Sequence, residues 1–311
     1  MWPPAPAHRP GPARAPSGSL YHEQGRIPRL GKLTWWAEFL LVPALITAAV
    51  LATNMIGIGI AAVVETDPPP ADSEQIFTNP LANLTALLIG LAASIPAVWF
   101  VVRWVGRRPA GTLSSVTGRL RLGWLGRCSA IAFALMAVQL GLLLAWTSDT
   151  DTGAALERGF PGWPALLLSL AVLCAVVPFQ AAAEEYVFRG WMVQLIGRVV
   201  RSPWPGTVLA SLLFALAHGL GESSGFALLF YSALWWGWLV IRTGGLEAVI
   251  ALHTANNLLG LVLAAAFGEL ADSGTAADAP WQALILELVF APLYCLMVAH
   301  LADRKGLSRR S

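Results

Sequence analysis

Long apolar windows alternate with short polar segments along almost the whole chain. A helix that crosses the hydrocarbon core of a bilayer needs about 20 mostly apolar residues, whereas a barrel strand would show about ten residues of alternating polarity. That alternation is missing from the sequence, so the windows predict helices. They lie at residues 35–64, 81–102, 124–147, 164–183, 204–220, 225–241, 246–268 and 281–301, of which the fifth and sixth are the shortest.

The composition favours a membrane protein and excludes several other classes. Of the 311 residues, 56% are apolar and only 12% are charged, whereas an average soluble domain carries about 25% charged residues. One soluble core could not hide so much apolar surface, and three cysteines are too few for a secreted disulfide scaffold. We therefore predict an all-α, polytopic membrane protein of about eight transmembrane helices.

The charges between the windows alternate in sign from one loop to the next. Basic segments carry Arg9, Arg14, Arg26, Arg29 and Lys32, then Arg107, Arg108, Arg119 and Arg121, then Arg198, Arg201 and Arg242, and finally Arg304, Lys305, Arg309 and Arg310. Acidic loops carry Glu65, Asp67, Asp72 and Glu74, then Asp149, Asp151 and Glu157 beside a single Arg158, and then Glu269, Asp272 and Asp278. Because loops rich in Lys and Arg stay in the cytoplasm, we expect both termini to be cytoplasmic.

Two terminal segments lie outside the windows. Residues 1–34 are basic, rich in proline and poor in apolar side chains, so we expect a disordered cytoplasmic tail. The window that follows is too long for the apolar region of a cleaved signal peptide. Residues 303–311 are expected to form a second, basic cytoplasmic tail. Nearly all the basic residues are arginine and alanine is abundant, which is typical of a GC-rich bacterial source and places the protein in the inner (plasma) membrane.

Few ionisable residues fall inside the windows, and each is a functional candidate because a bilayer penalises charge. Glu38 and His300 lie near the ends of their windows, where a side chain can reach the interface by snorkelling. Glu287 lies about two turns inside the last window, where we expect a structural hydrogen bond to a neighbouring helix.

The remaining ionisable residues form a set on three apolar segments. The fourth window runs into Glu184, Glu185 and Arg189, the fifth carries His218, and the seventh carries His253 and Asn257. Residues four apart share one face of a helix, whereas adjacent residues diverge by about 100°. We therefore expect Glu185 and Arg189 to form an ion pair and Glu184 to keep its carboxylate on another side. His253 and Asn257 are expected to face one point.

Such a set suits two kinds of hydrolytic site. In one, Glu184, His218 and His253 bind zinc, which activates a water molecule and polarises a carbonyl. In the other, Glu184 acts as general base, His218 helps to orient the water, and His253 and Asn257 donate hydrogen bonds to the developing oxyanion. Both predict attack of water on a carbonyl, and a peptide bond is the carbonyl most suited to a membrane site. The HExxH pattern of soluble metalloproteases is not found in the sequence.

Three short motifs carry a resemblance to a known family. The segments EEYVFRG at 184–190, FALAH at 214–218 and HTANN at 253–257 match, in order, EExxxR, FxxxH and HxxxN. They resemble the CPBP family of intramembrane proteases, which includes the type II CAAX prenyl endopeptidase and bacterial bacteriocin-processing and self-immunity proteins. The resemblance implies an eight-helix membrane fold whose site opens laterally and toward the cytoplasm.

The resemblance also implies roles for single residues and a division of the chain. It implies catalytic roles for Glu184, His218, His253 and Asn257, with Glu185 and Arg189 supporting the site, and it leaves the choice between zinc and a glutamate-activated water open. Residues 161–302 are expected to form the protease-like domain, and the windows within 35–160 carry no motif.

Three functional hypotheses follow. The leading one is an intramembrane endopeptidase that cleaves a membrane-associated or lipid-modified peptide or protein near the cytoplasmic face. The alternative is a non-catalytic membrane protein of the same fold that acts in bacteriocin self-immunity or as a scaffold or regulator. A transporter is a third class, although the windows show no inverted repeat. No nucleic-acid partner is expected, and the substrate and the oligomeric state stay open.

Overall fold

The computed structural model describes residues 13–28, 30–64, 69, 75–147, 159–271 and 276–311. Seven helical segments in this part of the chain are long and apolar enough to cross a membrane. They are Lys32–Val64, Pro80–Trp104, Leu122–Thr147, Trp163–Gly197, Ser223–Thr243, Glu247–Phe267 and Trp281–Arg304. The prediction of an all-α, polytopic membrane protein is therefore confirmed.

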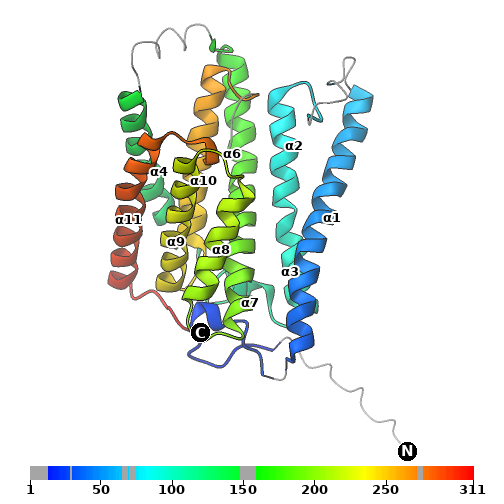
Figure 1. Ribbon diagram of the computed structural model, residues 1–311, viewed down its shortest axis with the longest axis vertical. Coiled ribbons are helices and arrows are strands. Elements are labelled where there is room, and N and C mark those ends of the chain that lie inside the picture. Colours follow the sequence, from blue (N-terminus) through cyan, green and yellow to red (C-terminus); the bar gives the residue numbers. More distant parts are fainter. Residues whose placement is uncertain (1–12, 29, 65–68, 70–74, 148–158, 272–275) are drawn as a thin grey trace, which may run out of the picture.

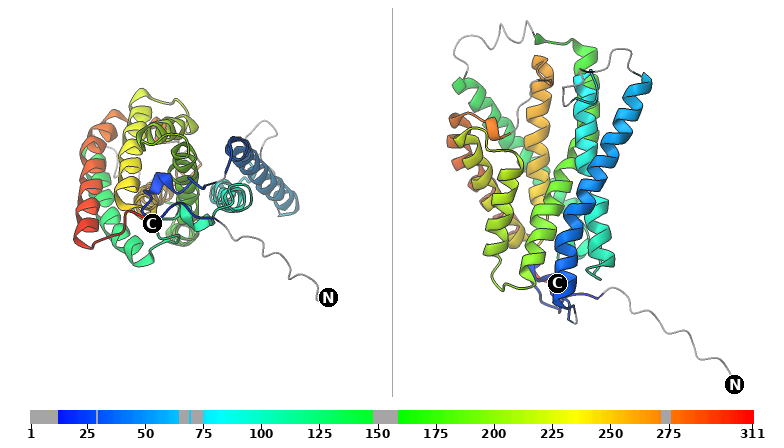
Figure 2. Two further views of the ribbon diagram at one scale, coloured as in Figure 1. Left: turned by 90° about the horizontal axis from the view of Figure 1, so that it is seen from below. Right: turned by 45° about the vertical axis from the view of Figure 1, so that its right-hand side comes forward.

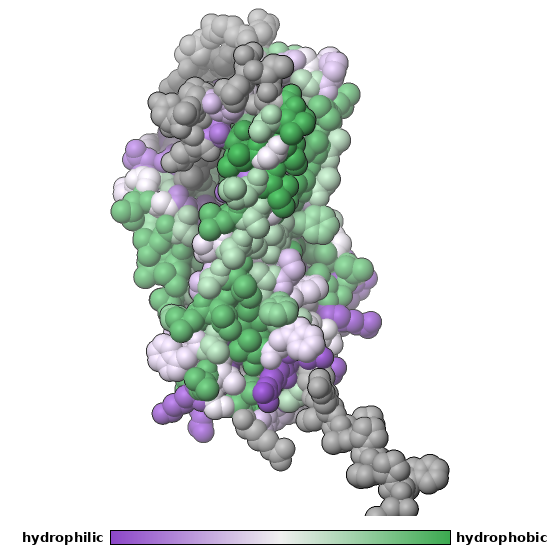
Figure 3. Space-filling view, turned by 90° about the vertical axis from the view of Figure 1, so that its right-hand side faces the viewer, coloured by the Kyte–Doolittle hydropathy of each residue, from purple (hydrophilic) through white to green (hydrophobic). Residues whose placement is uncertain are grey.

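The first three helices form one edge of the bundle, whereas the fourth lies on the opposite side, against α10 and α11 (Figures 1 and 2). Helix α1 spans Lys32–Val64, α2 Pro80–Ala92, α3 Ser94–Trp104 and α4 Leu122–Thr147. The two helices α2 and α3 meet at Ala93 and together make one span. Figure 3 shows hydrophobic side chains over much of the face to which α1 contributes, and on α1 itself Leu40, Met55 and Ile56 are each more than 60% exposed. In a bilayer this apolar surface faces lipid.

The C-terminal half supplies the remaining helices, and its α10 packs chiefly against α4 and α6. Helix α6 spans Trp163–Glu185 and continues through the π-helix η3, Tyr186–Met192, into α7, Val193–Gly197. It is followed by α8 (Trp204–Ala217), α9 (Ser223–Thr243), α10 (Glu247–Phe267) and α11 (Trp281–Arg304). Short 3-10 helices cover Tyr21–Glu23 (η1), Ala110–Leu113 (η2) and Ala276–Asp278 (η4).

Helix α8 is too short to span the membrane by itself. Its 14 residues rise about 21 Å at 1.5 Å per residue, against a hydrocarbon core of about 30 Å. The fifth window of the sequence therefore corresponds to a short apolar helix, and seven spans meet the length requirement.

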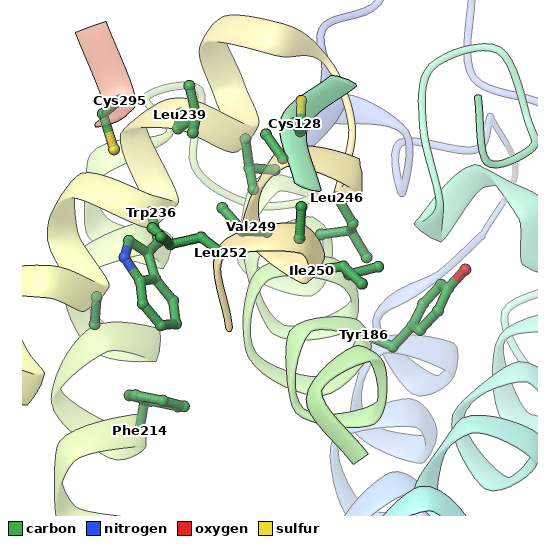
Figure 4. Close-up of a cluster of buried hydrophobic side chains, with 14 of the residues drawn as sticks. Cys128, Tyr186, Phe214, Trp236, Leu239, Leu246, Val249, Ile250, Leu252 and Cys295 are labelled. Carbon is green, nitrogen blue, oxygen red and sulfur yellow. The ribbon is translucent and has the colours of Figure 1, made fainter. Parts of the chain in front are cut away.

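Helix α10 lies at the centre of the buried core (Figure 4). Leu246, Val249 and Leu252 are almost wholly buried among side chains from neighbouring elements. The Tyr294 hydroxyl of α11 donates a hydrogen bond to the Ala248 carbonyl at 2.8 Å. Because both faces of α10 are covered, residues on this helix are held in fixed positions relative to α4 and α6.

Residues 13–28 correct the expectation of a disordered tail up to residue 34. Tyr21 and Ile27 are buried, and the Tyr21 hydroxyl donates to the Leu113 carbonyl. Arg26 donates to the carbonyls of Gly197 and Val200, at the end of α7. The segment is ordered because its few apolar side chains enter the core while Arg26 satisfies carbonyls that a helix end leaves without partners. Residues 1–12 lie outside the described part of the chain.

The end of the chain lies at this same end of the bundle (Figure 1). The Ser311 backbone N–H donates to the Ser19 carbonyl at 3.1 Å, and the Gly18 N–H donates to the Ser311 carbonyl at 2.6 Å. The basic segment 303–311 is therefore attached to residues 18–19 and is not a separate tail.

Glu38 corrects a second expectation. It is fully buried and does not snorkel to the interface; Arg108 and Arg198 pair with it at 2.9 Å and 2.6 Å. Two arginines from different loops thus neutralise one carboxylate of α1. His300 is exposed, as expected for a residue near a helix end. Most of the acidic loop residues named above, from Glu65 to Glu74, from Asp149 to Glu157 and Asp272, lie outside the described residues.

The expected structural role of Glu287 is confirmed. Its carboxylate, in α11, accepts hydrogen bonds from Gln139 of α4 at 2.8 Å and from Ser232 of α9. These bonds connect three spans. They stabilise the contact because separating the helices would leave a polar group unsatisfied in hydrocarbon, which is costly.

Candidate active site

Two antiparallel helices, α6 and α10, carry most of the site. Gln180 and Glu184 lie one turn apart on α6, and His253 and Asn257 lie one turn apart on α10. Residues at this spacing share a face, so each helix presents two polar side chains to the other. Two side-chain pairs therefore connect the helices: Glu184 faces His253, and Gln180 contacts Asn257.

Glu185 orients the imidazole of His253. The Glu185 carboxylate is fully buried, and its Oε1 lies 2.9 Å from Nη1 of Arg189 and 2.8 Å from Nδ1 of His253. The predicted ion pair between Glu185 and Arg189 is therefore confirmed. A carboxylate paired with arginine accepts hydrogen bonds, so the proton of this contact lies on Nδ1 and the ring is turned with Nε2 toward Glu184.

Glu184 keeps one oxygen open, as its different direction from Glu185 predicts. Its Oε1 accepts a hydrogen bond from the side-chain amide of Gln180. Its Oε2 is buried, has no hydrogen-bond partner among the described residues, and lies 3.7 Å from Nε2 of His253. That separation exceeds a direct hydrogen bond. Glu184 Oε2 and His253 Nε2 thus point toward each other, and each can still accept a hydrogen bond.

Asn257 is joined to α6 by a residue that the motifs do not include. Its Nδ2 donates to Oε1 of Gln180 at 3.1 Å, and Asn256 donates to its Oδ1 at 3.4 Å. Sequence reasoning missed Gln180, although an amide one turn before Glu184 in an apolar helix was a usable signal.

His218 is placed differently from the other candidates. It is half-buried and directly follows the last residue of α8, and its Nδ1 lies 2.9 Å from the Phe214 carbonyl oxygen. The ring of Phe214 lies 4.6 Å from the His218 ring and 5.8 Å from the His253 ring, centroid to centroid. The FxxxH motif therefore puts an aromatic ring next to both imidazoles.

Phe214 also supports the buried arginine. The Arg189 guanidinium lies 4.1 Å from the centre of the Phe214 ring and 5.1 Å from that of Trp236. Attraction between a desolvated cation and aromatic faces compensates in part for the charge held in the membrane interior. Trp236 was not singled out in the sequence, where one tryptophan among 14 gives no signal.

The proposed zinc ligands do not form a three-ligand group. Within the part of the chain that the structure describes, no three or more His, Cys, Asp or Glu side chains are arranged to hold a metal ion. Glu184 Oε2 and His253 Nε2 converge, and zinc would accept both donors, but the third expected ligand, His218, does not complete such a group with them. The residues therefore fit zinc only in part.

A cavity of about 560 Å³ lies elsewhere, between α1, α2 and α6. Residues such as Ile60, Ile89 and Val172 line it, and none of its lining residues is titratable. Val172 precedes Glu184 by 12 residues of helix, about 18 Å at 1.5 Å per residue. This cavity is therefore separate from the polar site.

Comparison with known proteins finds a family similar to the segment that holds the site. A curated relative, the uncharacterized protein YyaK of Bacillus subtilis (strain 168), is 27% identical over 196 residues, which are 60% of this chain and 62% of the relative. No solved structure matches the chain. Residues 163–259 match the family model described as Type II CAAX prenyl endopeptidase Rce1-like, and they include all six of the predicted site residues. The predicted family resemblance is thereby confirmed for the segment that carries the site, which is similar to the Rce1-like family of type II CAAX prenyl endopeptidases.

Proposed function

We propose that the protein is an intramembrane endopeptidase that hydrolyses a peptide bond of a membrane-associated protein or peptide. One observation carries the proposal: the open Oε2 of Glu184 lies 3.7 Å from the Nε2 of an imidazole that Glu185 holds in place. The match to a family of prenyl endopeptidases supports the reaction class.

In the proposed step, a water molecule donates one hydrogen to Glu184 Oε2 and the other to His253 Nε2, and its lone pairs face a substrate carbonyl. Because the proton of the His253 ring lies on Nδ1, Nε2 accepts this hydrogen bond and does not donate one to the oxyanion, contrary to the expectation from the sequence. As the new C–O bond forms, the first proton passes to Glu184. The carbonyl oxygen becomes an oxyanion, and the second N–H of the Asn257 amide is available to donate to it. The C–N bond then breaks as Glu184 returns the proton to the leaving nitrogen.

A metal version stays part of the proposal. Zinc held by Glu184 and His253, with His218 moving in as third ligand, would supply a more acidic water and a polarised carbonyl. Loss of cleavage with a chelator and recovery with zinc would favour this version. Retention of cleavage in chelator would favour the glutamate-activated water. The role of His218 in either version is a prediction.

The central experiment compares two glutamates of different spans in purified protein, reconstituted into liposomes with a membrane-anchored peptide library. Glu184→Gln should lower kcat by about 10²- to 10⁴-fold, the usual contribution of general acid–base catalysis. Glu287→Gln is the matched control, because Glu287 is buried and hydrogen-bonded in another span and should keep wild-type kcat. Undiminished cleavage by folded Glu184→Gln would refute the proposal.

The proposed setting is the bacterial plasma membrane, with both termini and the site facing the cytoplasm and a substrate that can carry a lipid. The rival function, a non-catalytic protein in self-immunity or regulation, makes a different prediction in cells. His253→Ala would leave the phenotype of the intact gene unchanged if the fold alone acts, and would abolish it if hydrolysis is needed.

A further inference from the structure

Gln180 is a buried amide in the middle of a membrane span. Its side chain is 3% exposed, and the helix around it is apolar from Trp163 to Ala183 apart from Ser169. A polar side chain at such depth is costly unless its donors and acceptors are satisfied. The two ends of this amide are satisfied by two residues of the proposed site.

The amide connects the two helices through opposite hydrogen-bonding roles. Its Nε2 donates to Oε1 of Glu184, on its own helix, and its Oε1 accepts from Nδ2 of Asn257, on α10. A carboxylate at position 180 would have no hydrogen to donate to Glu184, and an apolar side chain could make neither bond. The position thus requires a donor and an acceptor on one planar group.

We propose that Gln180 is a positioning residue, which selects Glu184 Oε2 as the oxygen that faces His253 and fixes the amide of Asn257 beside it. The inference rests on the proposed function, because the selected oxygen is the one assigned to the water. By occupying Oε1, Gln180 leaves Oε2 as the open atom at 3.7 Å from Nε2 of His253. By accepting one N–H of Asn257, it leaves the other N–H directed elsewhere in the site.

The test uses a matched pair of buried glutamines on one continuous helical segment. Gln194 is also fully buried, and it donates to the Thr112 carbonyl at 2.7 Å, outside the Glu184–His253 pair. Methionine is close to glutamine in shape and lacks both hydrogen-bonding groups. Gln180→Met and Gln194→Met therefore remove similar groups at comparable burial.

In the cleavage assay, Gln180→Met should lower kcat by about 10- to 100-fold with KM within about twofold, because misplacement of a catalytic group by about 1 Å costs up to about 100-fold. The acid limb of its pH–kcat/KM profile should also move. Gln194→Met should lower thermal stability to a similar extent and leave both kcat and the profile unchanged. Gln180→Glu is the second variant, and it should be at least as impaired as Gln180→Met.

A readout independent of cleavage separates this inference from the proposed function. The imidazole ¹⁵N resonances of His253, assigned by their loss in His253→Gln, should shift in Gln180→Met and stay in place in Gln194→Met. Wild-type kcat or unshifted His253 resonances in folded Gln180→Met would overturn the positioning role. If the wild type cleaves nothing, the proposed function fails, and the resonances still decide the role of Gln180.

Discussion

Glu184 and Glu185 are adjacent, yet their environments differ because their side chains leave the helix about 100° apart. Glu185 is fully buried, and its Oε1 contacts both Arg189 and His253. Glu184 is partly exposed, and among the described residues its ion-pair contact is His253 and not an arginine. A carboxylate that is paired with a buried arginine holds the geometry of the site, whereas one that faces an imidazole without an arginine partner is available for proton transfer. The two glutamates therefore divide into a supporting and a reacting residue.

If Glu185 supports the site, a variant can regain the stability of the wild type without regaining its activity. Glu185→Gln should lower the free energy of unfolding by about 3–5 kcal/mol, because it leaves the buried guanidinium of Arg189 without its counter-charge. The double variant Glu185→Leu with Arg189→Met removes both charges and should recover most of that loss. It should still fail to cleave, since Nδ1 of His253 loses its acceptor.

Thermal unfolding in detergent and cleavage in liposomes are the two measurements for these variants. Cleavage at the wild-type rate by the double variant would contradict the orienting role of Glu185. Failure of the double variant to regain stability would show that the pair also makes a net contribution to the fold.

At the scale of elements, the π-helix η3 joins the site to the end of the bundle. It begins at Tyr186, directly after the two glutamates, and contains Arg189, so the change in helical geometry falls inside the EExxxR motif. Local π-helical geometry is frequent at functional sites. Beyond it, α7 ends at Gly197 against the backbone of His22. The position of η3 is thus fixed from one side by the core and from the other by the N-terminal segment.

Gly197 provides a test of that packing. A Cβ at this position would overlap the carbonyl oxygen of His22, which is backbone and cannot turn away. Gly197→Ala should therefore lower the free energy of unfolding by about 1–3 kcal/mol, as overpacking does. Gly126→Ala is the control, because nothing lies within 4 Å of its Cβ and alanine favours a helix interior by about 0.8–1 kcal/mol. Thermal melts in detergent measure both, and equal melting temperatures for the two variants would contradict the packing.

At the scale of the whole molecule, the N-terminal segment closes the end of the bundle where the C-terminus lies (Figures 1 and 2). His22 is buried there, and its Nε2 lies 2.9 Å from the Arg201 carbonyl oxygen, so Nε2 carries the proton. Its Nδ1 is buried and has no hydrogen-bond partner among the residues that the structure describes. Burial lowers the pKa of His22 below its ordinary value of 6.5, although the bond to Arg201 and the charge of Glu23 oppose this; the charge of Arg26 adds to it.

This lowered pKa gives the attachment of residues 13–28 a pH dependence. The detached segment binds a proton near pH 6.5 while the attached one resists it, so attachment is strongest above about pH 6.5 and weakens as pH falls below that value. Hydrogen exchange of the backbone amides in residues 19–28 should be faster at pH 5.5 than at pH 7.5 after correction for the intrinsic rate. His22→Gln should remove this difference, and a persistent difference in that variant would assign the effect to another group.

The sequence by itself determined the membrane class, the apolar windows that became spans, the pairing of Glu185 with Arg189 and the structural role of Glu287. These features follow from the transfer free energy of single side chains and from helix periodicity, which act within one segment. The motifs also located the Rce1-like segment before any contact was known.

Only the tertiary structure decided which atoms meet and which terminal residues fold. The contact between Glu185 and His253 joins residues 68 apart in the chain, and that between Gln180 and Asn257 joins residues 77 apart. Neither contact can be predicted from the sequence pattern within one helix, because both contacts depend on how α6 and α10 pack against each other. The burial of Tyr21 and of Glu38 is likewise set by partners on distant loops, so composition alone predicted a free tail and an interfacial carboxylate where the fold has buried contacts.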